Sequence, residues 1–255
     1  MKNWKENILA PLIFTVALLI LWELACRVFS LPATVLPTPT AIAKAMVQYW
    51  PAIWENSLQT LMTTLLGFAL AIVFGLALGI GIGWSKFIYG ALYPVMIAFN
   101  AIPKVAVVPI LIIWFGIGTI PAIFTAFLIS FFPIVVNVAT GLATTEPELQ
   151  DVLRALGASK LDIVRKVGIP RSMPYFFGSL KVAVTLAFVG SVVSETIGAN
   201  SGLGQMMLAA QAGFNVELVF AGVMALAILG IALYAITALI EKRFTGWAFR
   251  AEGIG

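Results

Sequence analysis

Residues 151–171, DVLRALGASKLDIVRKVGIPR, form a compact charged stretch in an otherwise hydrophobic chain. They contain five of the 15 Lys and Arg residues and two of the 11 acidic residues. Apolar and almost uncharged sequence lies on both sides of them. A charged, helix-like insert in so apolar a chain indicates a role that differs from that of the segments around it.

The composition indicates an integral membrane protein. Of the 255 residues, 61% are hydrophobic and 10% are charged, and the mean hydropathy is +1.05. Soluble domains are about 45–50% apolar and about 25% charged, and a soluble domain of this size still needs a polar surface. With no histidine and only Cys26, the chain has no histidine relay, Cys/His metal site or disulfide framework. We expect an all-α, polytopic membrane protein.

Six segments are long and apolar enough to cross a bilayer, which takes about 20 residues of helix. We expect one transmembrane domain over residues 1–255, with spans at about 8–28, 57–82, 91–115, 120–142, 174–197 and 218–240. The third and fourth spans are separated only by a tight turn at 116–119, and Pro103 and Pro109 interrupt the third. Proline removes a backbone hydrogen bond and usually kinks a spanning helix.

The N-terminal segment has an alternative interpretation as a cleaved signal peptide, because Leu24-Ala25-Cys26 resembles a lipoprotein cleavage site. Glu23 stands where such a site needs an apolar residue, and the apolar run from Ile8 is long enough to span. We therefore expect a first transmembrane helix that is retained.

The basic residues predict the orientation, because cytoplasmic loops carry an excess of Lys and Arg. One side has only Lys44 and, at a span end, Arg27. The other side collects eleven: Lys2, Lys5, Lys86, Arg154, Lys160, Arg165, Lys166, Arg171, Lys242, Arg243 and Arg250. Both termini and the 143–173 loop are thus predicted to be cytoplasmic, and the 31–56 and 198–217 segments to lie outside.

The 143–173 loop is predicted to form two short helices. Thr145 and Glu148 fit a capping box that starts the first helix, and Gly157 suits its end, where a left-handed residue is needed. Ser159 resembles a second N-cap with an acid three residues later, and Ile169-Pro170 is expected to end the second helix.

The first helix is predicted to be amphipathic. Gln150, Asp151 and Arg154 take its polar face, opposite an apolar stripe of Leu149, Val152, Leu153 and Leu156. Such a helix pair can dock into a groove on a partner, or it can lie on anionic lipid through its basic residues. The pattern alone leaves both interpretations open.

Residues 151–170 resemble the EAA loop of binding-protein-dependent ABC importer permeases of type I, which have the MetI-like fold. Gly157 matches the glycine of that loop, Asp151 stands for its glutamate, and Ile169-Pro170 for its ending. Val152 and Leu153 replace its two alanines, which is a departure from the pattern. PILIIWFGIG at 109–118, FFPIVVNVATG at 131–141 and SETIGANSGLGQMM at 194–207 resemble the nitrate, sulfonate and taurine branch, so that the resemblance covers nearly the whole chain.

The resemblance implies that the loop is a coupling helix that docks into a cleft on a separate ATPase subunit. The docking residues would be Leu149, Asp151, Val152, Leu153, Arg154, Gly157, Ala158 and Ser159. It further implies a bacterial inner-membrane importer of a small anion (nitrate, a sulfonate such as taurine, or a carboxylate). Its partners would be a second permease copy, two ATP-binding subunits that hold ATP and Mg²⁺, and an extracytoplasmic binding protein, with no nucleic acid.

The glycine-rich stretch GLALGIGIGWSK at 75–86 is not a phosphate-binding loop, because Ser85 separates the last glycine region from Lys86. Gly75, Gly79 and Gly83 instead form a series that lets spanning helices approach closely. We find no catalytic constellation and no nucleotide or metal site in the sequence, and so expect ATP to be handled by a partner.

Charged residues inside spans are costly and are functional candidates. We expect Lys104, beside Pro103, to face the pathway and offer positive potential to an anion; the alternative is snorkelling or an internal pair. Glu195 lies near the outer end of the fifth span, and its alternatives are a structural ion pair or an outer helix end. Asn100 and Asn137 are further pathway candidates, as are Ser191, Ser194 and Thr196, although such residues also form ordinary interhelical hydrogen bonds.

Two other classes remain as rivals from the sequence. A stand-alone channel or secondary transporter would need no ATPase, and its 143–173 loop would only lie on lipid. An intramembrane enzyme would need catalytic residues that the pattern does not contain.

Overall fold

The computed structural model describes residues 4–144 and 147–245, and over these ranges the chain is helical and contains no strand. The elements in chain order are α1 (Trp4–Val28), α2 (Pro39–Gln48), α3 (Trp50–Gly83), α4 (Lys86–Asn100), the 3-10 turn η1 (Lys104–Val107), α5 (Val108–Phe115), α6 (Thr119–Ala143), α7 (Pro147–Ala155), α8 (Lys160–Ile163), the π-helical turn η2 (Val164–Gly168), α9 (Ile169–Gly198), α10 (Leu203–Ala212) and α11 (Val216–Thr245). The predicted all-α class is confirmed.

Five helices are long and apolar enough to cross a membrane, namely α1, α3, α6, α9 and α11. A sixth span is present if α4 and the η1–α5 segment form one broken span, which is bent by 72°. Five of the six predicted spans therefore correspond to single long apolar helices, and the third corresponds to the two helices of the bent pair. The second is longer than predicted, because α3 begins at Trp50 rather than Ser57.

The break in the third span is sharper than the kink that the prolines predicted. Pro103 has an extended ψ of 94° and precedes the 3-10 turn. A proline also disfavours helical geometry in the residue before it, here Ile102. The chain therefore leaves α4 at Asn100 and starts again in a new direction.

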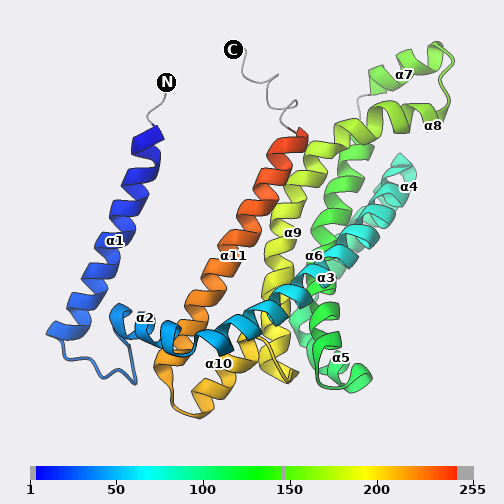
Figure 1. The fold of residues 1–255 in the computed structure, drawn as a ribbon. Coiled ribbons are helices and arrows are strands. Elements are labelled where there is room, and N and C mark those ends of the chain that lie inside the picture. The colour runs from blue at the N-terminus through cyan, green and yellow to red at the C-terminus, as the bar shows by residue number, and fades with distance from the viewer. Residues whose placement is uncertain (1–3, 145–146, 246–255) are drawn as a thin grey trace.

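The first and last helices place the start of α1 and the end of α11 on the same side of the bundle (Figure 1). The start of α1, the end of α11 and the α7–α8 pair lie at one end, and α2, α5 and α10 lie at the other. The start of the first span and the end of the last thus lie on the same side as the α7–α8 pair, while the termini themselves lie outside the described residues. The assignment of that end to the cytoplasm stays a prediction from the basic residues.

The centre of the bundle is formed by α3, α6 and α9. Half of the membrane-spanning window of α6 is buried, more than in any other described span. Glycines of α3 face α6 so closely that an added Cβ would lie 2.5–2.8 Å from the Cβ atoms of Ala126, Ile134, Val138 and Leu142. The glycines are Gly67, Gly75, Gly79 and Gly83. The predicted packing role of the glycine series is confirmed.

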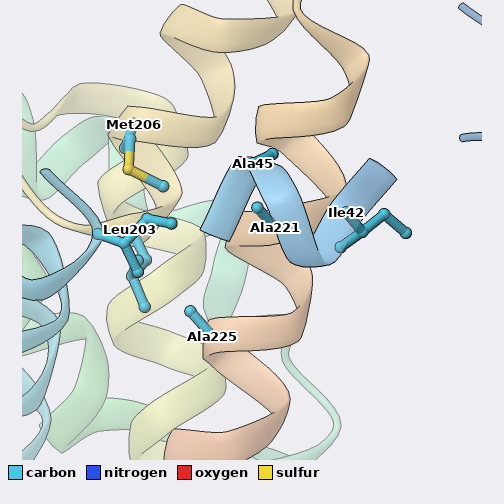
Figure 2. Packing of buried hydrophobic residues seen from close by; sticks show 7 residues of the cluster. Ile42, Ala45, Leu203, Met206, Ala221 and Ala225 are labelled. Atoms are coloured by element: carbon cyan, nitrogen blue, oxygen red, sulfur yellow. The ribbon is translucent and has the colours of Figure 1, made fainter. Parts of the chain in front are cut away.

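A cluster of buried apolar side chains joins four helices at the end of the bundle opposite the α7–α8 pair (Figure 2). The side chains come from α2, α3, α10 and α11, and Ile53 is the member from α3. The labelled members are Ile42, Ala45, Leu203, Met206, Ala221 and Ala225. The cluster fixes the short helices α2 and α10 against the long helix α11.

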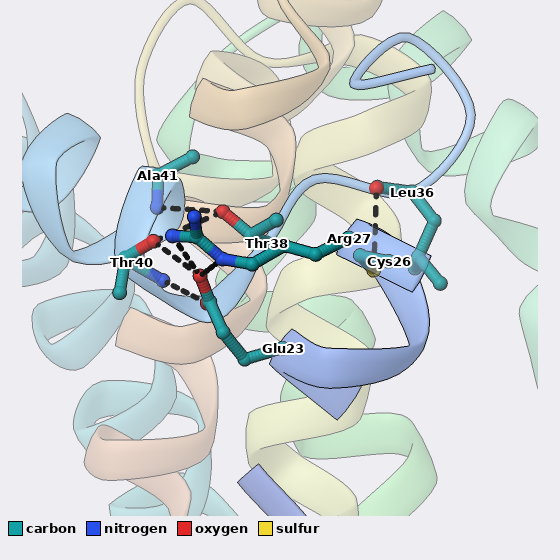
Figure 3. Close-up of polar contacts among 7 residues, drawn as sticks. All are labelled: Glu23, Cys26, Arg27, Leu36, Thr38, Thr40 and Ala41. Atoms are coloured by element: carbon teal, nitrogen blue, oxygen red, sulfur yellow. Dashed lines mark hydrogen bonds and ion pairs between the residues drawn. The ribbon is translucent and has the colours of Figure 1, made fainter. Parts of the chain in front are cut away.

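Helix α1 contacts α2 near its own C-terminal end (Figure 3). Glu23 of α1 accepts hydrogen bonds from the backbone N–H of Thr40 at 3.1 Å and from its hydroxyl at 2.9 Å, and it pairs with Arg27 at 2.6 Å. Thr38 caps α2 by accepting from the backbone N–H of Ala41. A carboxylate is stabilised at a helix N-terminus by unpaired N–H groups, which explains why α1 is fastened there.

The second helix of the 143–173 loop does not end at Ile169-Pro170, so that prediction was wrong. Helix α8 continues through η2 into α9, and Leu161–Gly198 form one apolar helix of 38 residues. Proline removes one donor and collides with the carbonyl four residues earlier in an α-helix. The preceding π-helical turn changes that hydrogen-bonding pattern, which allows Pro170 to be accommodated without a break.

We predict that Gly79→Ala destabilises the protein by about 1–3 kcal/mol, as overpacking of a tight contact does. The new Cβ would lie 2.8 Å from the Cβ of Val138. The apparent melting temperature of the purified chain should fall by several degrees.

The matched control is Gly81→Ala in the same helix, where nothing lies within 4 Å of an added Cβ. Removing a helical glycine there should leave the melting temperature unchanged or slightly raised. Equal melting temperatures for the two variants would show that α3 and α6 do not approach as described.

Candidate functional site

The predicted docking segment is a preformed bend between α7 and α8. Gly157 has φ of +83° and its N–H donates to the carbonyl of Arg154 at 2.9 Å. The N–H of Ala158 donates to the carbonyl of Leu153 at 3.0 Å. These two bonds form a Schellman motif, which uses a glycine at the left-handed position. The predicted helix stop at Gly157 is confirmed.

The second helix starts with a capping box, as predicted. The hydroxyl of Ser159 accepts from the N–H of Asp162 at 3.2 Å, and the carboxylate of Asp162 accepts from the N–H of Ser159 at 3.2 Å. Reciprocal bonds of this kind satisfy two otherwise unpaired donors. The other predicted capping box, with its N-cap at Thr145, lies outside the described residues.

Apolar side chains on this bend are exposed in the single chain. The exposed fractions are 57% for Val152, 78% for Leu156 and 60% for Leu161. Leu153 is half-buried, while the side chain of Leu149 is outside the described part. Asp151 and Arg154 form an exposed ion pair at 3.0 Å on the polar face. The bend thus exposes apolar side chains, while the backbone groups at the end of α7 and the start of α8 are already hydrogen-bonded.

A second candidate region is the break in the third span, where Lys104 lies. Its ammonium donates to the side-chain oxygen of Asn100 at 2.8 Å and to the backbone carbonyl of Asn100 at 3.2 Å. Its Nζ also lies 5.5 Å from the ring centroid of Phe132 on α6, within range of a cation–π interaction. A cation at the C-terminus of α4 is favoured by the helix dipole.

These contacts bring two of the predicted pathway residues together. Lys104 is half-buried, and no acidic partner for it occurs in the part of the chain that the structure describes. The internal pair that we considered as an alternative for Lys104 is therefore made with the side-chain amide and the backbone carbonyl of Asn100. Asn137 does not join this group, because its side chain donates to the carbonyl of Pro133 in its own helix at 2.8 Å.

Glu195 lies near the C-terminal end of α9 and is only 1% exposed. Its Oε2 accepts from the hydroxyl of Thr60 at 2.9 Å and from the N–H of Gly204 at 3.1 Å. The hydroxyls of Thr63 and Ser191 lie 3.3 and 3.4 Å from Oε1. Within the described ranges no cation pairs with it, so that hydroxyl and backbone donors stand in place of the ion pair that we considered as an alternative.

The remaining polar candidates are divided between these environments. Ser191 belongs to the group around Glu195 and also contacts Thr63. Thr196 donates to the carbonyl of Val193 in its own helix at 2.8 Å. The hydroxyl of Ser194 is buried and has no partner among the described residues.

The sequence analysis missed the partners of these side chains. Nothing near Glu195 in the sequence indicates Thr60 and Thr63, which come from α3. The usable signal was periodic: small and hydroxyl residues recur along the buried face of α3, and small residues mark close helix contacts in membranes. The nearness of Phe132 to Lys104 had no comparable signal.

Residues 71–246, more than half of the chain, match the family model of the binding-protein-dependent transport system inner membrane component. The formylaminopyrimidine transport permease protein ThiX of Halalkalibacterium halodurans is 32% identical, over 94% of this chain and 96% of that protein. The riboflavin transport system permease protein RibX of Chloroflexus aurantiacus is 33% identical, over 90% and 87%.

More distant comparisons agree. The taurine transport system permease protein TauC of Escherichia coli is 26% identical, over 91% of this chain and 86% of that protein. A chain of the inward-facing MetNI methionine ABC transporter superposes with a TM-score of 0.66 at 22% identity, over 78% of this chain and 98% of that one. The last similarity concerns the fold alone.

Proposed function

The chain belongs to the family of binding-protein-dependent transport system inner membrane components, the permease subunits of ABC importers, and we propose that it imports a small anion delivered by an extracytoplasmic binding protein. The substrate would be nitrate, a sulfonate such as taurine, or a carboxylate. Two copies would form the pathway around a two-fold axis. ATP and Mg²⁺ would be bound by two partner ATPase subunits. The chain would lie in a bacterial inner membrane, with both of its termini in the cytoplasm.

The bend between α7 and α8 carries the proposal of ATPase coupling. Three apolar side chains are exposed there, namely Val152, Leu156 and Leu161. The backbone N–H and C=O groups at the neighbouring helix ends already form hydrogen bonds within the chain. A surface of this kind loses little conformational freedom when it docks, and so binds a groove at low cost. A stand-alone channel or secondary transporter, the alternative from the sequence, has no use for such a surface and is disfavoured by the family membership.

The proposal of an anionic substrate depends on Lys104. Broken helices in transporters line cavities where their ends meet the substrate, and this lysine lies at such a break. The relative TauC supports an anion, because taurine carries a sulfonate group. A second candidate is a nitrogen heterocycle, supported by the relatives ThiX and RibX, whose names give formylaminopyrimidine and riboflavin as substrates.

We predict that Leu156→Glu weakens copurification of the candidate ATPase subunit by about tenfold or more, a loss of about 1.4 kcal/mol. The reason is that docking would bury an unpaired charge in place of an apolar side chain. Gly157→Pro should have at least as large an effect, because proline fixes φ near −65° whereas Gly157 has φ of +83°.

Gly157→Asn is the matched control, since asparagine also occupies the left-handed position at helix ends. It should copurify like the wild type. Equal binding by Gly157→Pro and the wild type would mean that the docking surface lies elsewhere. If the wild type did not bind the ATPase subunit either, the alternative function as a channel or secondary transporter would be favoured.

We predict that Lys104→Gln raises KM for an anionic substrate by about tenfold in proteoliposomes of the assembled transporter, while its ATPase assembly is unchanged. Loss of a half-buried cation removes attraction that a neutral donor cannot replace. Uptake of a neutral heterocycle should not change by more than about twofold.

Lys104→Arg serves as the comparison that keeps the charge. An unchanged KM for every anion tested with Lys104→Gln would refute the anionic substrate. Efficient, Lys104-independent uptake of formylaminopyrimidine or riboflavin would favour the heterocyclic candidate.

A further inference from the structure

The carboxyl group of Glu195 connects three parts of the outer end that are distant in sequence. It projects from α9, and its Oε2 accepts from Thr60 of α3 and from Gly204 at the start of α10. Thr60 in turn accepts from the N–H of Leu203 at 2.9 Å. We call Glu195, Thr60, Thr63, Ser191 and Gly204 the Glu195 cluster.

Each backbone N–H group of residues 202–204 donates a hydrogen bond. Gly202 donates to the side-chain oxygen of Asn56 at 2.8 Å, Leu203 donates to Thr60, and Gly204 donates to Glu195. These are side-chain acceptors, so the segment is not held by a regular backbone ladder. Its position therefore depends on a small number of polar side chains from α3 and α9.

Close packing of the segment on the carboxyl group also requires its two glycines. A Cβ on Gly202 would lie 2.3 Å from the Cδ of Glu195, and the φ of Gly202 is +110°. A Cβ on Gly204 would lie 2.9 Å from the Cβ of Glu195. The segment is thus shaped around this side chain and not merely near it.

The same end of α9 fixes the outer half of the broken span. The N–H of Gly118, in the turn between α5 and α6, donates to the carbonyl of Gly198 at 3.1 Å. A Cβ on Gly198 would lie 2.5 Å from the Cδ1 of Ile112 in α5. The end of α9 that carries Glu195 therefore also positions α5, which follows the break at Lys104.

We propose that Glu195 is a positioning residue for transport, whose carboxyl group fastens the 202–204 segment to α3 so that the outer ends of α3, α9 and α10 move as one unit. The proposal rests on the permease function proposed above. It assigns Glu195 a hydrogen-bonding role instead of an electrostatic role toward the substrate. The 1% exposure of Glu195 and its hydroxyl and backbone partners carry this distinction.

The hydrogen-bond pattern makes glutamine the informative replacement. A glutamine oxygen at the Oε2 position can accept from Thr60 and Gly204, and its NH₂ group can donate to the hydroxyl oxygens of Thr63 and Ser191. Leucine fills the space but accepts no hydrogen bond, so that buried donors are left unpaired. A hydrogen-bonding role therefore predicts opposite outcomes for Glu195→Gln and Glu195→Leu.

The first measurement is hydrogen–deuterium exchange of the 199–207 region in the full chain in lipid nanodiscs. We expect Glu195→Leu to speed exchange at residues 202–204 by about tenfold or more, because local opening becomes easier. Glu195→Gln should stay within about threefold of the wild type. Glu217→Gln, which changes an exposed outer carboxylate in the first turn of α11, is the matched control and should not differ.

The second measurement is uptake per ATP hydrolysed by the assembled transporter in proteoliposomes. Glu195→Leu should lower this ratio by about tenfold and raise ATP hydrolysis without the binding protein, whereas Glu195→Gln should keep the ratio within about threefold. A role limited to folding would lower the amount of assembled complex without raising hydrolysis. Should Glu195→Leu fail to assemble, Thr60→Val, which keeps the shape but removes one donor and one acceptor, should give the same changes in smaller measure.

Protected amides at 202–204 in Glu195→Leu would overturn the proposal. So would a loss of uptake in Glu195→Gln as complete as in Glu195→Leu with those amides still protected, because charge would then be the required property. If the wild type shows no uptake that depends on ATP and a binding protein, the permease function has failed, and the exchange measurement alone decides whether Glu195 holds the segment.

Discussion

The close approach of α6 to its two neighbours is the constraint on which the other contacts depend. Apolar side chains gain little from helix contact in lipid, so association relies on close van der Waals packing and hydrogen bonds. Gly75 and Gly79 allow α6 to pack closely against α3. Gly190 does the same for α9, because a Cβ added there would lie 3.1 Å from the Cα of Ala126. With both faces fixed, α3 and α9 are held near enough for Thr60 to reach Glu195.

This arrangement connects the two ends of the molecule through one helix. The continuous helix Leu161–Gly198 has 38 residues, which is about 57 Å at 1.5 Å per residue. It starts in the α7–α8 bend and ends three residues after Glu195. A displacement applied at the bend would therefore reach the Glu195 cluster without crossing a flexible loop. The π-helical turn η2, at the point where the bend joins α9, is the irregular part of this connection.

The sequence predicted those features that depend on local chemistry. Apolar length indicated the spans, Gly157 indicated a left-handed helix end, and Ser159 with Asp162 indicated a capping box, because each of these is decided within a few residues. It failed at Pro170, where the π-helical turn keeps the helix continuous, and it understated the break at Pro103. The environment of Glu195 was beyond its reach, since the partners are 135 and 132 positions away in sequence at Thr60 and Thr63. Pairings of that kind depend on which helices meet, and local patterns do not contain that information.

The contacts of Lys104 explain why charge alone does not identify the substrate. A lysine ammonium has three N–H donors, and two contacts to Asn100 are already present. An arriving anion would have to use the remaining donor or displace Asn100, while a ring carbonyl needs one donor only. Phe132, whose ring centroid lies 5.5 Å from the ammonium, is buried in the core against Met96 and Val135 and contacts the lysine from α6. The decisive contribution of Lys104 would be to the strength of binding, because the ammonium attracts a full negative charge more strongly than a neutral acceptor.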